Sequence, residues 1–313
     1  MNIQSVLEKY SSKIDYLDLD LLISAVIKKP REFVLTHPEY KLKKSQILNL
    51  KSQISRRIKN EPVAYILGKK EFYGLEFKVD KNTLIPRPET EQLVELVLKE
   101  LRTKNYQPKT SIIDVGTGSG NIIISIAKAI DKFKIQSRVL GTKFKIIGID
   151  ISRKALKIAR QNAKMHKLDK KINFLQGNLL EPIIRNSIPS TRDKIQNSII
   201  IANLPYLSSK IYNSAPGDVK NYEPRFALLS DANGLGHYKK LFKQLKKLQT
   251  ARLASTSNLC ESRRANCKLQ TFIEFSPEQK NQLKKAILNA FPRSHPIFFK
   301  DLSGRFRIIQ IEL

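Results

Sequence analysis

The sequence lacks the features of a membrane or secreted protein. It contains no stretch of about 18 uncharged apolar residues, so no membrane span is expected. Residues 1–10 carry Glu8 and Lys9 and no long apolar run, so no secretory signal is expected either. The two cysteines, Cys260 and Cys267, and the four histidines do not have the spacing of a metal site. We therefore expect a cytoplasmic protein without a bound metal.

Acidic residues are scarce relative to basic ones. The chain has 28 Asp and Glu against 57 Lys and Arg, which gives a formal net charge of +29. Such a charge favours polyanionic surroundings, so a weak association with nucleic acid or the ribosome is expected. The lysines are spread rather than clustered, and a Lys-rich composition explains them equally well. The charge therefore names no substrate.

The length of 313 residues leaves room for a sizeable core and two domains. Apolar residues recur every three or four positions over residues 1–70, including the run 43–59, and predict a helical domain that either caps the rest or recognises the substrate. Strand-like residues around Gly74 predict a hairpin, and Pro86 and Pro88 stiffen the segment after it. We expect a helical domain at 1–70, a hairpin linker at 71–88 and a third domain at 89–313.

A glycine-rich loop is the strongest local pattern. A short apolar strand around residues 112–113 leads to Asp114, and a helical apolar pattern begins at Ile122. The loop between them consists of Gly116, Thr117, Gly118, Ser119 and Gly120. Glycines allow close approach of backbone to ligand, and a helix N-terminus presents free N–H groups. Gly-x-Gly-x-Gly with an acid two residues before it differs from the dinucleotide motif and favours S-adenosylmethionine.

Two further strands end in residues that suit the rest of such a cofactor. The strand 145–150 ends in Asp150, whose carboxylate could accept hydrogen bonds from a ribose diol. The same side chain could also cap the helix expected over 152–165. The strand 172–178 is followed by Leu179, which we expect beside the adenine with Asn178, and residues 183–197 are predicted as loop.

The stretch 198–206 is where we expect the chemistry. Four apolar residues, 199–202, predict a strand buried on both faces, which Pro205 must end. Ligands of open α/β sheets bind at such strand ends. Asn203 offers a carbonyl acceptor, and the carbonyl of Leu204 is expected to be free because the chain leaves the sheet there. Two acceptors can fix both hydrogens of an amide or an exocyclic amine, and Tyr206 offers a flat face for stacking. We therefore predict Asn203, Pro205 and Tyr206 as catalytic residues; the alternative is a strand followed by an ordinary proline turn.

The C-terminal part continues the alternation of strands and helices. We expect a helix to about residue 248, a strand at 271–275, a helix at 278–290, a turn at 300–307 and a final strand at 308–313. This pattern predicts an α/β fold with a doubly wound, mostly parallel sheet. Residues 249–270 form a polar, basic stretch for which no element is predicted.

Seven segments together resemble the release factor glutamine methyltransferases, the HemK family. They are Leu-Ile-Pro-Arg-Pro-Glu-Thr-Glu (84–91), the glycine loop (114–120), Asp-Ile-Ser (150–152), Asn-Leu-Pro-Tyr (203–206), Tyr-Glu-Pro-Arg-Phe-Ala-Leu (222–228), Asn-Gly-Leu (233–235) and Asp-Leu-Ser-Gly-Arg (301–305). The resemblance covers nearly the whole length, and the first and fifth segments are the family-specific ones.

The resemblance implies a Rossmann-like, S-adenosylmethionine-dependent methyltransferase domain after a small helical domain. The implied reaction methylates the side-chain amide nitrogen of the Gln in the Gly-Gly-Gln tripeptide of class I peptide chain release factors. By matching position, residues 116–120 hold the methionine part of the cofactor, Asp150 the ribose and Leu179 the adenine side. Asn203 would contact both cofactor and substrate, and Asn203, Leu204, Pro205 and Tyr206 would bind the glutamine amide.

Three other functions remain open from the sequence. One is methylation of a ribosomal protein glutamine, against which the segment 84–91 argues. A second is an RNA or DNA adenine amino-methyltransferase, favoured by the net charge and by Leu204, where the family usually has proline. A third is an RNA-binding protein without activity, which the intact glycine loop, Asp150 and Asn203 disfavour. We expect a monomer that does not bind membranes.

Overall fold

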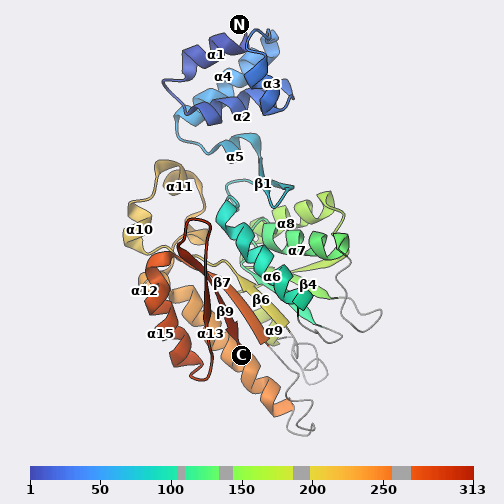
Figure 1. The fold of residues 1–313 in the computed structure, drawn as a ribbon, viewed down its shortest axis with the longest axis vertical. Coiled ribbons are helices and arrows are strands. Elements are labelled where there is room, and N and C mark those ends of the chain that lie inside the picture. The colour runs from blue at the N-terminus through green and yellow to red at the C-terminus, as the bar shows by residue number, and fades with distance from the viewer. Residues whose placement is uncertain (104–109, 134–143, 186–197, 256–268) are drawn as a thin grey trace.

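The computed structural model describes residues 1–103, 110–133, 144–185, 198–255 and 269–313. Five helices form the N-terminal part: α1 Ile3–Tyr10, α2 Tyr16–Ile27, α3 Arg31–Thr36, α4 Lys44–Ile58 and α5 Val63–Leu67. Their apolar faces bury one another in a separate small core. Figure 1 shows this helical unit in blue at one end of the molecule, connected to the rest through α5 and β1.

Helix α4 confirms the helical run predicted at 43–59. The apolar spacing from residue 6 to residue 17, in contrast, is split between two helices. Helix α1 ends at Tyr10, and α2 begins after Asp15, whose side chain accepts a hydrogen bond from the Leu17 N–H at 2.8 Å. A capping Asp stabilises a new helix start, which apolar spacing alone does not reveal.

A hairpin of β1 Lys69–Phe72 and β2 Leu75–Lys78 comes after the helices. Its turn residues, Tyr73 and Gly74, have φ angles of 52° and 68°, as a two-residue type I′ turn requires. Phe72 and Phe77 are buried in the core of the C-terminal part, so the hairpin is anchored there. The predicted hairpin is confirmed, although it begins two residues before 71; the three-part division of the chain stays a prediction.

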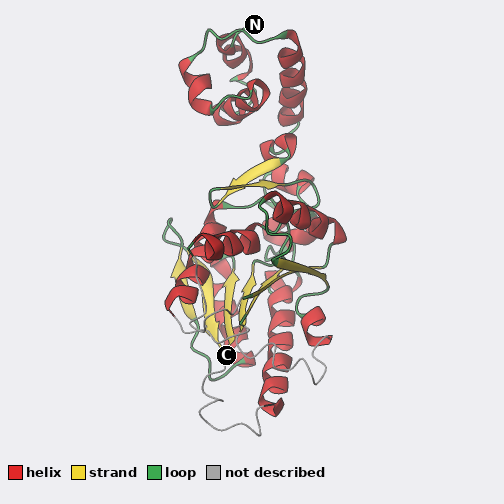
Figure 2. Ribbon diagram, turned by 90° about the vertical axis from the view of Figure 1, so that its right-hand side faces the viewer, coloured by secondary structure: helices red, strands yellow, loops and turns green. Residues whose placement is uncertain are grey.

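A seven-stranded sheet forms the centre of the C-terminal part, in the order β5-β4-β3-β6-β7-β9-β8. Its strands are β3 Ser111–Val115, β4 Lys145–Asp150, β5 Ile172–Gln176, β6 Ser198–Ala202, β7 Leu269–Glu274, β8 Ile297–Lys300 and β9 Phe306–Glu312. The first five in spatial order are parallel, and β9 and β8 add an antiparallel edge. This arrangement confirms the doubly wound, mostly parallel sheet (Figure 2).

Helices cover both faces of this sheet (Figure 1). One face carries α6 Glu91–Thr103, α7 Asn121–Lys132 and α8 Arg153–Met165; the other carries α9 Glu181–Arg185, α13 Gly236–Ser255 and α15 Lys280–Ala290. In β6, Ile199 and Ile201 pack toward the first face, and Ile200 and Ala202 toward the second. Such burial on both faces explains the unbroken apolar run.

Short elements complete the described chain. They are the 3₁₀ turns η1 Pro88–Thr90, η3 Arg225–Ala227 and η4 Pro277–Gln279, and the helices α10 Ser209–Asn213, α11 Gly217–Tyr222 and α12 Asp231–Gly234. No helix in the part of the chain that the structure describes is long and apolar enough to cross a membrane. Within the same residues, no group of three or more His, Cys, Asp or Glu side chains is placed to hold a metal ion.

Three sequence predictions need correction. Residues 183–185, predicted as the start of a loop, belong to α9; α13 continues to Ser255 rather than ending near 248; and β8 was not predicted. Helix α9 has only five residues, too few to show a helical period, and β8 is a four-residue edge strand. The rest of the predicted loop, 186–197, and most of the stretch 249–270 lie outside the described residues.

Candidate functional site

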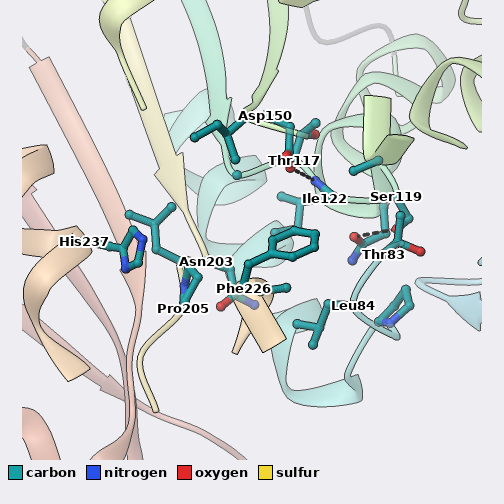
Figure 3. A pocket seen from close by; sticks show the side chains of 18 of the residues that line it. Thr83, Leu84, Thr117, Ser119, Ile122, Asp150, Asn203, Pro205, Phe226 and His237 are labelled. Atoms are coloured by element: carbon teal, nitrogen blue, oxygen red, sulfur yellow. Dashed lines mark hydrogen bonds between the residues drawn. The ribbon is translucent and has the colours of Figure 1, made fainter. Parts of the chain in front are cut away.

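A cavity opens at the carboxyl ends of β3, β4, β5 and β6 and encloses about 960 Å³, including its open mouth. Its floor is formed by the residues that directly follow these strands, including 116–119, 150–151, 177–179 and 203–205. Its walls come from two segments distant in sequence, 82–90 and 226–227 (Figure 3). Parallel α/β sheets place ligands at this edge.

The glycine loop turns sharply at the floor of the cavity. Gly116, Gly118 and Gly120 have φ angles of 76°, 55° and 82°, which side chains with a Cβ rarely adopt. A Cβ at Gly116 would lie 3.0 Å from Cδ2 of Leu204, and one at Gly120 would lie 2.8 Å from Cδ1 of Ile124. Glycine is therefore required both by the turn and by close packing. Thr117 and Ser119 line the cavity between them.

Two buried carboxylates hold the loop in place. Asp114, on β3, accepts a hydrogen bond from the Thr117 hydroxyl at 2.6 Å, and burial raises the pKa of Asp114 to about 7. Asp150 accepts from the Gly118 N–H at 2.9 Å and from the Ser152 N–H at 2.8 Å. Burial raises the pKa of Asp150, whereas these backbone donors favour its charged form.

Helix α8 is capped by Ser152, whose hydroxyl accepts a hydrogen bond from the Ala155 N–H. Asp150 is therefore not the cap of this helix. Its carboxylate instead joins the end of β4 to the glycine loop and lines the cavity beside Ile151. This position leaves a ribose role for Asp150 open.

Leu179 follows β5 at the edge of the cavity, with a left-handed φ of 56°. Gln244 of α13 fixes this turn: its side-chain carbonyl accepts from the Leu180 N–H at 2.6 Å, and its amide donates to the Asn178 carbonyl at 3.3 Å. Gln244 was not predicted from the sequence, because no local pattern connects α13 to this turn. Asn178 and Leu179 both line the cavity, and their position beside the adenine stays a prediction.

Asn203 and Pro205 line the cavity directly after β6 (Figure 3). The amide nitrogen of Asn203 donates to the Thr90 hydroxyl at 3.3 Å. The Leu204 carbonyl is not as free as expected, because it lies 3.2 Å from the buried Tyr238 hydroxyl, whose single hydrogen it shares with the backbone carbonyl of Glu274. The chain does leave the sheet at Leu204, but α13 packs against it there. A carbonyl oxygen has two lone pairs, so one remains for a ligand.

Tyr206 is not among the residues that line this cavity. Its ring packs against the core on the α13 side of the sheet, where burial raises its pKa, and its carbonyl accepts from the Gln279 amide at 2.8 Å. The predicted stacking by Tyr206 therefore has no support in this cavity. The aromatic ring that lies across the cavity is that of Phe226, which is 55% exposed (Figure 3).

The two cavity walls are joined by Glu223. Its carboxylate accepts from the Ile85 N–H at 3.2 Å and forms an ion pair with the Arg87 guanidinium. The Glu223 side chain is 1% exposed and that of Arg87 34%. The segment predicted as a linker thus also forms part of the site. Both partners lie in segments that the sequence analysis singled out, but no local spacing shows an ion pair across 136 residues.

His237 is a further cavity residue that the sequence analysis did not select. Its Nδ1 lies 2.9 Å from the Ser230 hydroxyl, and its backbone N–H donates to the same oxygen. Burial lowers the pKa of His237, so the ring is predominantly neutral near neutral pH. A neutral ring adds no charge to the cavity.

Comparisons with known proteins match both parts of the chain. A methyltransferase domain family matches residues 107–288, and a PrmC N-terminal domain family matches residues 2–68. The release factor glutamine methyltransferase of Clostridium botulinum is 32% identical over 305 residues, covering 97% of this chain and 94% of the relative. That of Dictyoglomus turgidum is 33% identical over 95% of this chain and 90% of its own length. That of Aliivibrio fischeri is 37% identical over 70% of this chain and 68% of its own length.

Proposed function

The chain belongs to the family of release factor glutamine methyltransferases, and from this premise we propose that it methylates class I peptide chain release factors. The methyl group would pass from S-adenosylmethionine to the side-chain amide nitrogen of the Gln in their Gly-Gly-Gln tripeptide. The observation that carries the proposal is one cavity that holds both the glycine loop and Asn203. Cofactor and amide can therefore meet in a single site.

The residues of the cavity suit S-adenosylmethionine. The glycine loop offers backbone close to the ligand, and Asp150 and Leu179 also line the cavity. We assign the methionine part to Gly116, Thr117, Gly118, Ser119 and Gly120, the ribose to Asp150, the adenine side to Leu179 and a further cofactor contact to Asn203. All of these residues line the cavity except Gly120, which belongs to the turn of the loop. When bound, the cofactor supplies an electrophilic methyl group on a positively charged sulfur.

The role of the protein follows from the weak reactivity of amides. The lone pair of an amide nitrogen is delocalised, so the nitrogen attacks only when its orientation is fixed. The side-chain oxygen of Asn203 can accept one N–H of the substrate amide, and the second lone pair of the Leu204 carbonyl can accept the other. Good orientation of two reactants can save about 7–11 kcal/mol of the barrier. These acceptors also stabilise the positive charge that develops on nitrogen, which then loses one proton to leave a neutral methylated amide.

Pro205 shapes the cavity beside Asn203 and belongs to the proposed amide-binding set with Leu204. We keep Tyr206 in that set only as a prediction, because its ring lies outside the cavity lining. A monomer, a cytoplasmic location and a weak association with the ribosome through the charge of +29 are also parts of the proposal.

An adenine amino-methyltransferase is the second candidate, because two acceptors can hold an exocyclic amine as well as an amide. Leu204 and the net charge favour it. The match of residues 2–68 to the PrmC N-terminal domain and the full-length relatives favour the release factor instead. Methylation of a ribosomal protein glutamine would use the same amide geometry.

A methyl-transfer assay with radiolabelled S-adenosylmethionine distinguishes these substrates. It offers a release factor, the same factor with its tripeptide Gln replaced by Ala, and ribosomal RNA in parallel. We expect label on the first alone. Label on the RNA alone would replace the proposal with the adenine reaction, and label on both release factors would place the methyl group on another residue.

A further inference from the structure

Three side chains meet behind the substrate end of the cavity, each from a different element. Asn203 follows β6, Thr90 ends η1, and Glu274 ends β7. Strands β6 and β7 are paired up to Ala202 and Ile273, so Asn203 and Glu274 are the next residues in register. Thr90 is 2% exposed and Glu274 1%. Thr90 and Asn203 both line the cavity, whereas Glu274 is buried and is not part of the lining.

The hydrogen-bond donors among these three side chains can be counted. The Thr90 hydroxyl donates to the Glu274 carboxylate and so favours its charged form. A hydroxyl has one hydrogen, so Thr90 has only lone pairs left for Asn203. The Asn203 amide must therefore turn its NH2 group toward Thr90. Its Nδ2 atom lies 3.3 Å from the Thr90 Oγ1 atom. A flipped amide would set two oxygens against each other.

This count fixes the other end of the Asn203 amide. With its NH2 group held by Thr90, its carbonyl oxygen is left as the acceptor for a ligand N–H. A substrate amide presents N–H donors, so this orientation is the productive one. The opposite orientation would place two NH2 groups face to face. The order of the three residues thus determines which end of the Asn203 amide faces the substrate.

We propose that Thr90 and Glu274 are positioning residues that hold the Asn203 carbonyl oxygen toward the substrate amide. This inference rests on the proposed function and adds two residues that do not take part in the transfer itself. Glu274 supplies the negative charge that orients the Thr90 hydroxyl, and Thr90 transmits this orientation to Asn203. The Oε2 atom of Glu274 has no hydrogen-bond partner among the described residues, and the side-chain hydrogen bond of this carboxylate is with Thr90.

The ionisation of Glu274 makes the orientation of the Asn203 amide depend on pH. Burial raises the pKa of Glu274 to about 7, while Thr90 and the charges of Arg307 and Arg87 favour ionisation and Glu89 opposes it. Two buried tyrosines, Tyr206 and Tyr238, also face the Glu274 carboxylate. Once Glu274 is protonated, its own hydroxyl can donate to Thr90, which frees the Thr90 hydrogen for Asn203. The preference for the productive orientation is then lost.

The test compares Thr90→Val, Thr90→Ser and Glu274→Gln in the full chain, with a release factor as substrate. Thr90→Val removes the hydroxyl at nearly constant volume and should lower kcat about 10- to 100-fold, the usual effect of a misplaced reacting group. Thr90→Ser restores the hydroxyl and should restore kcat. The Kd of S-adenosylmethionine should change little in all three. Thr90→Val should also lower the unfolding midpoint, because it leaves the buried Glu274 carboxylate without its donor, and Thr90→Ser should restore the midpoint together with kcat.

The pH profile of kcat is a second test, because a purely structural role of Thr90 and Glu274 would not change it. The wild-type kcat should fall as the pH falls through about 7, and Glu274→Gln should remove this step. A Thr90→Val enzyme with wild-type kcat overturns the inference, and so does a pH step that persists in Glu274→Gln. If Thr90→Val does not fold, the profile of Glu274→Gln decides. A wild-type chain that labels no release factor refutes the proposed function instead, and the inference falls with it.

Discussion

Replacing Glu223 tests whether the two cavity walls must be held together. Its carboxylate is the point where the segment around Arg87 meets the segment that carries Phe226. Glu223→Ala removes the acceptor of the Ile85 N–H and the charge that faces Arg87. We expect the wall formed by residues 84–88 to move away from the substrate.

The magnitude follows from the burial of the two partners. A buried N–H left without an acceptor costs about 1–3 kcal/mol. Breaking a fully buried ion pair costs about 3–5 kcal/mol, but Arg87 is 34% exposed and water can replace much of the lost contact. We therefore expect the docked position of the wall to lose about 2 kcal/mol, so that kcat/KM for a release factor falls by up to roughly 30-fold.

Steady-state methyl transfer at varied release factor concentration measures this change. Glu223→Gln keeps an acceptor for Ile85 while losing the charge, so it should fall between wild type and Glu223→Ala. Glu71→Ala removes a carboxylate from the exposed side of β1 and serves as the control, for which no change is expected. A kcat/KM of Glu223→Ala equal to that of the control would refute the account of the walls.

Three further predictions concern the glycine loop, its buried acid and the exposed ring. In a urea titration, Gly120→Ala should lower the free energy of unfolding by at least about 2 kcal/mol, because left-handed strain and contact with Ile124 add together. Gly68 has a φ of 70° and no atom within 4 Å of the position that a Cβ would take, so Gly68→Ala should show the cost of the strain alone. Because burial raises the pKa of Asp114 to about 7, its contribution to stability is present at acid pH and lost as the pH rises through 7. Asp114→Asn should reduce this dependence of the free energy of unfolding on pH, and an unchanged pH dependence would contradict the assignment. Phe226→Ala should raise the KM for a release factor about tenfold with little change in unfolding, since a half-exposed ring contributes more to binding than to the core.

The sequence predicted those parts of the site that depend on neighbours along the chain. The glycine loop, Asp150, Leu179 and Asn203 each follow an apolar strand, and strand ends of a parallel sheet meet at one edge. The same reasoning predicted the sheet itself, since the apolar runs that precede these residues are typical of strands buried on both faces.

The remaining parts depend on contacts between distant segments. Nothing near Leu204 shows that the hydroxyl of Tyr238, 34 residues later, lies against its carbonyl. Nothing near Thr90 shows that it lies beside Asn203, 113 residues away. The aromatic role was predicted for Tyr206 because it lies close to Asn203 in the sequence, yet packing turns that ring to the core and brings Phe226 to the cavity. Pairings of this kind follow from tertiary packing, which a local pattern does not encode.

The central claim is that Asn203 holds the amide that receives the methyl group. The most direct measurement compares wild type with Asn203→Ala in a single-turnover methyl transfer to a release factor, with the Kd of S-adenosylmethionine measured in parallel. We predict that transfer is lost while the cofactor still binds, because the glycine loop and Asp150 are unchanged. An Asn203→Ala enzyme that keeps most of its transfer rate would contradict the account.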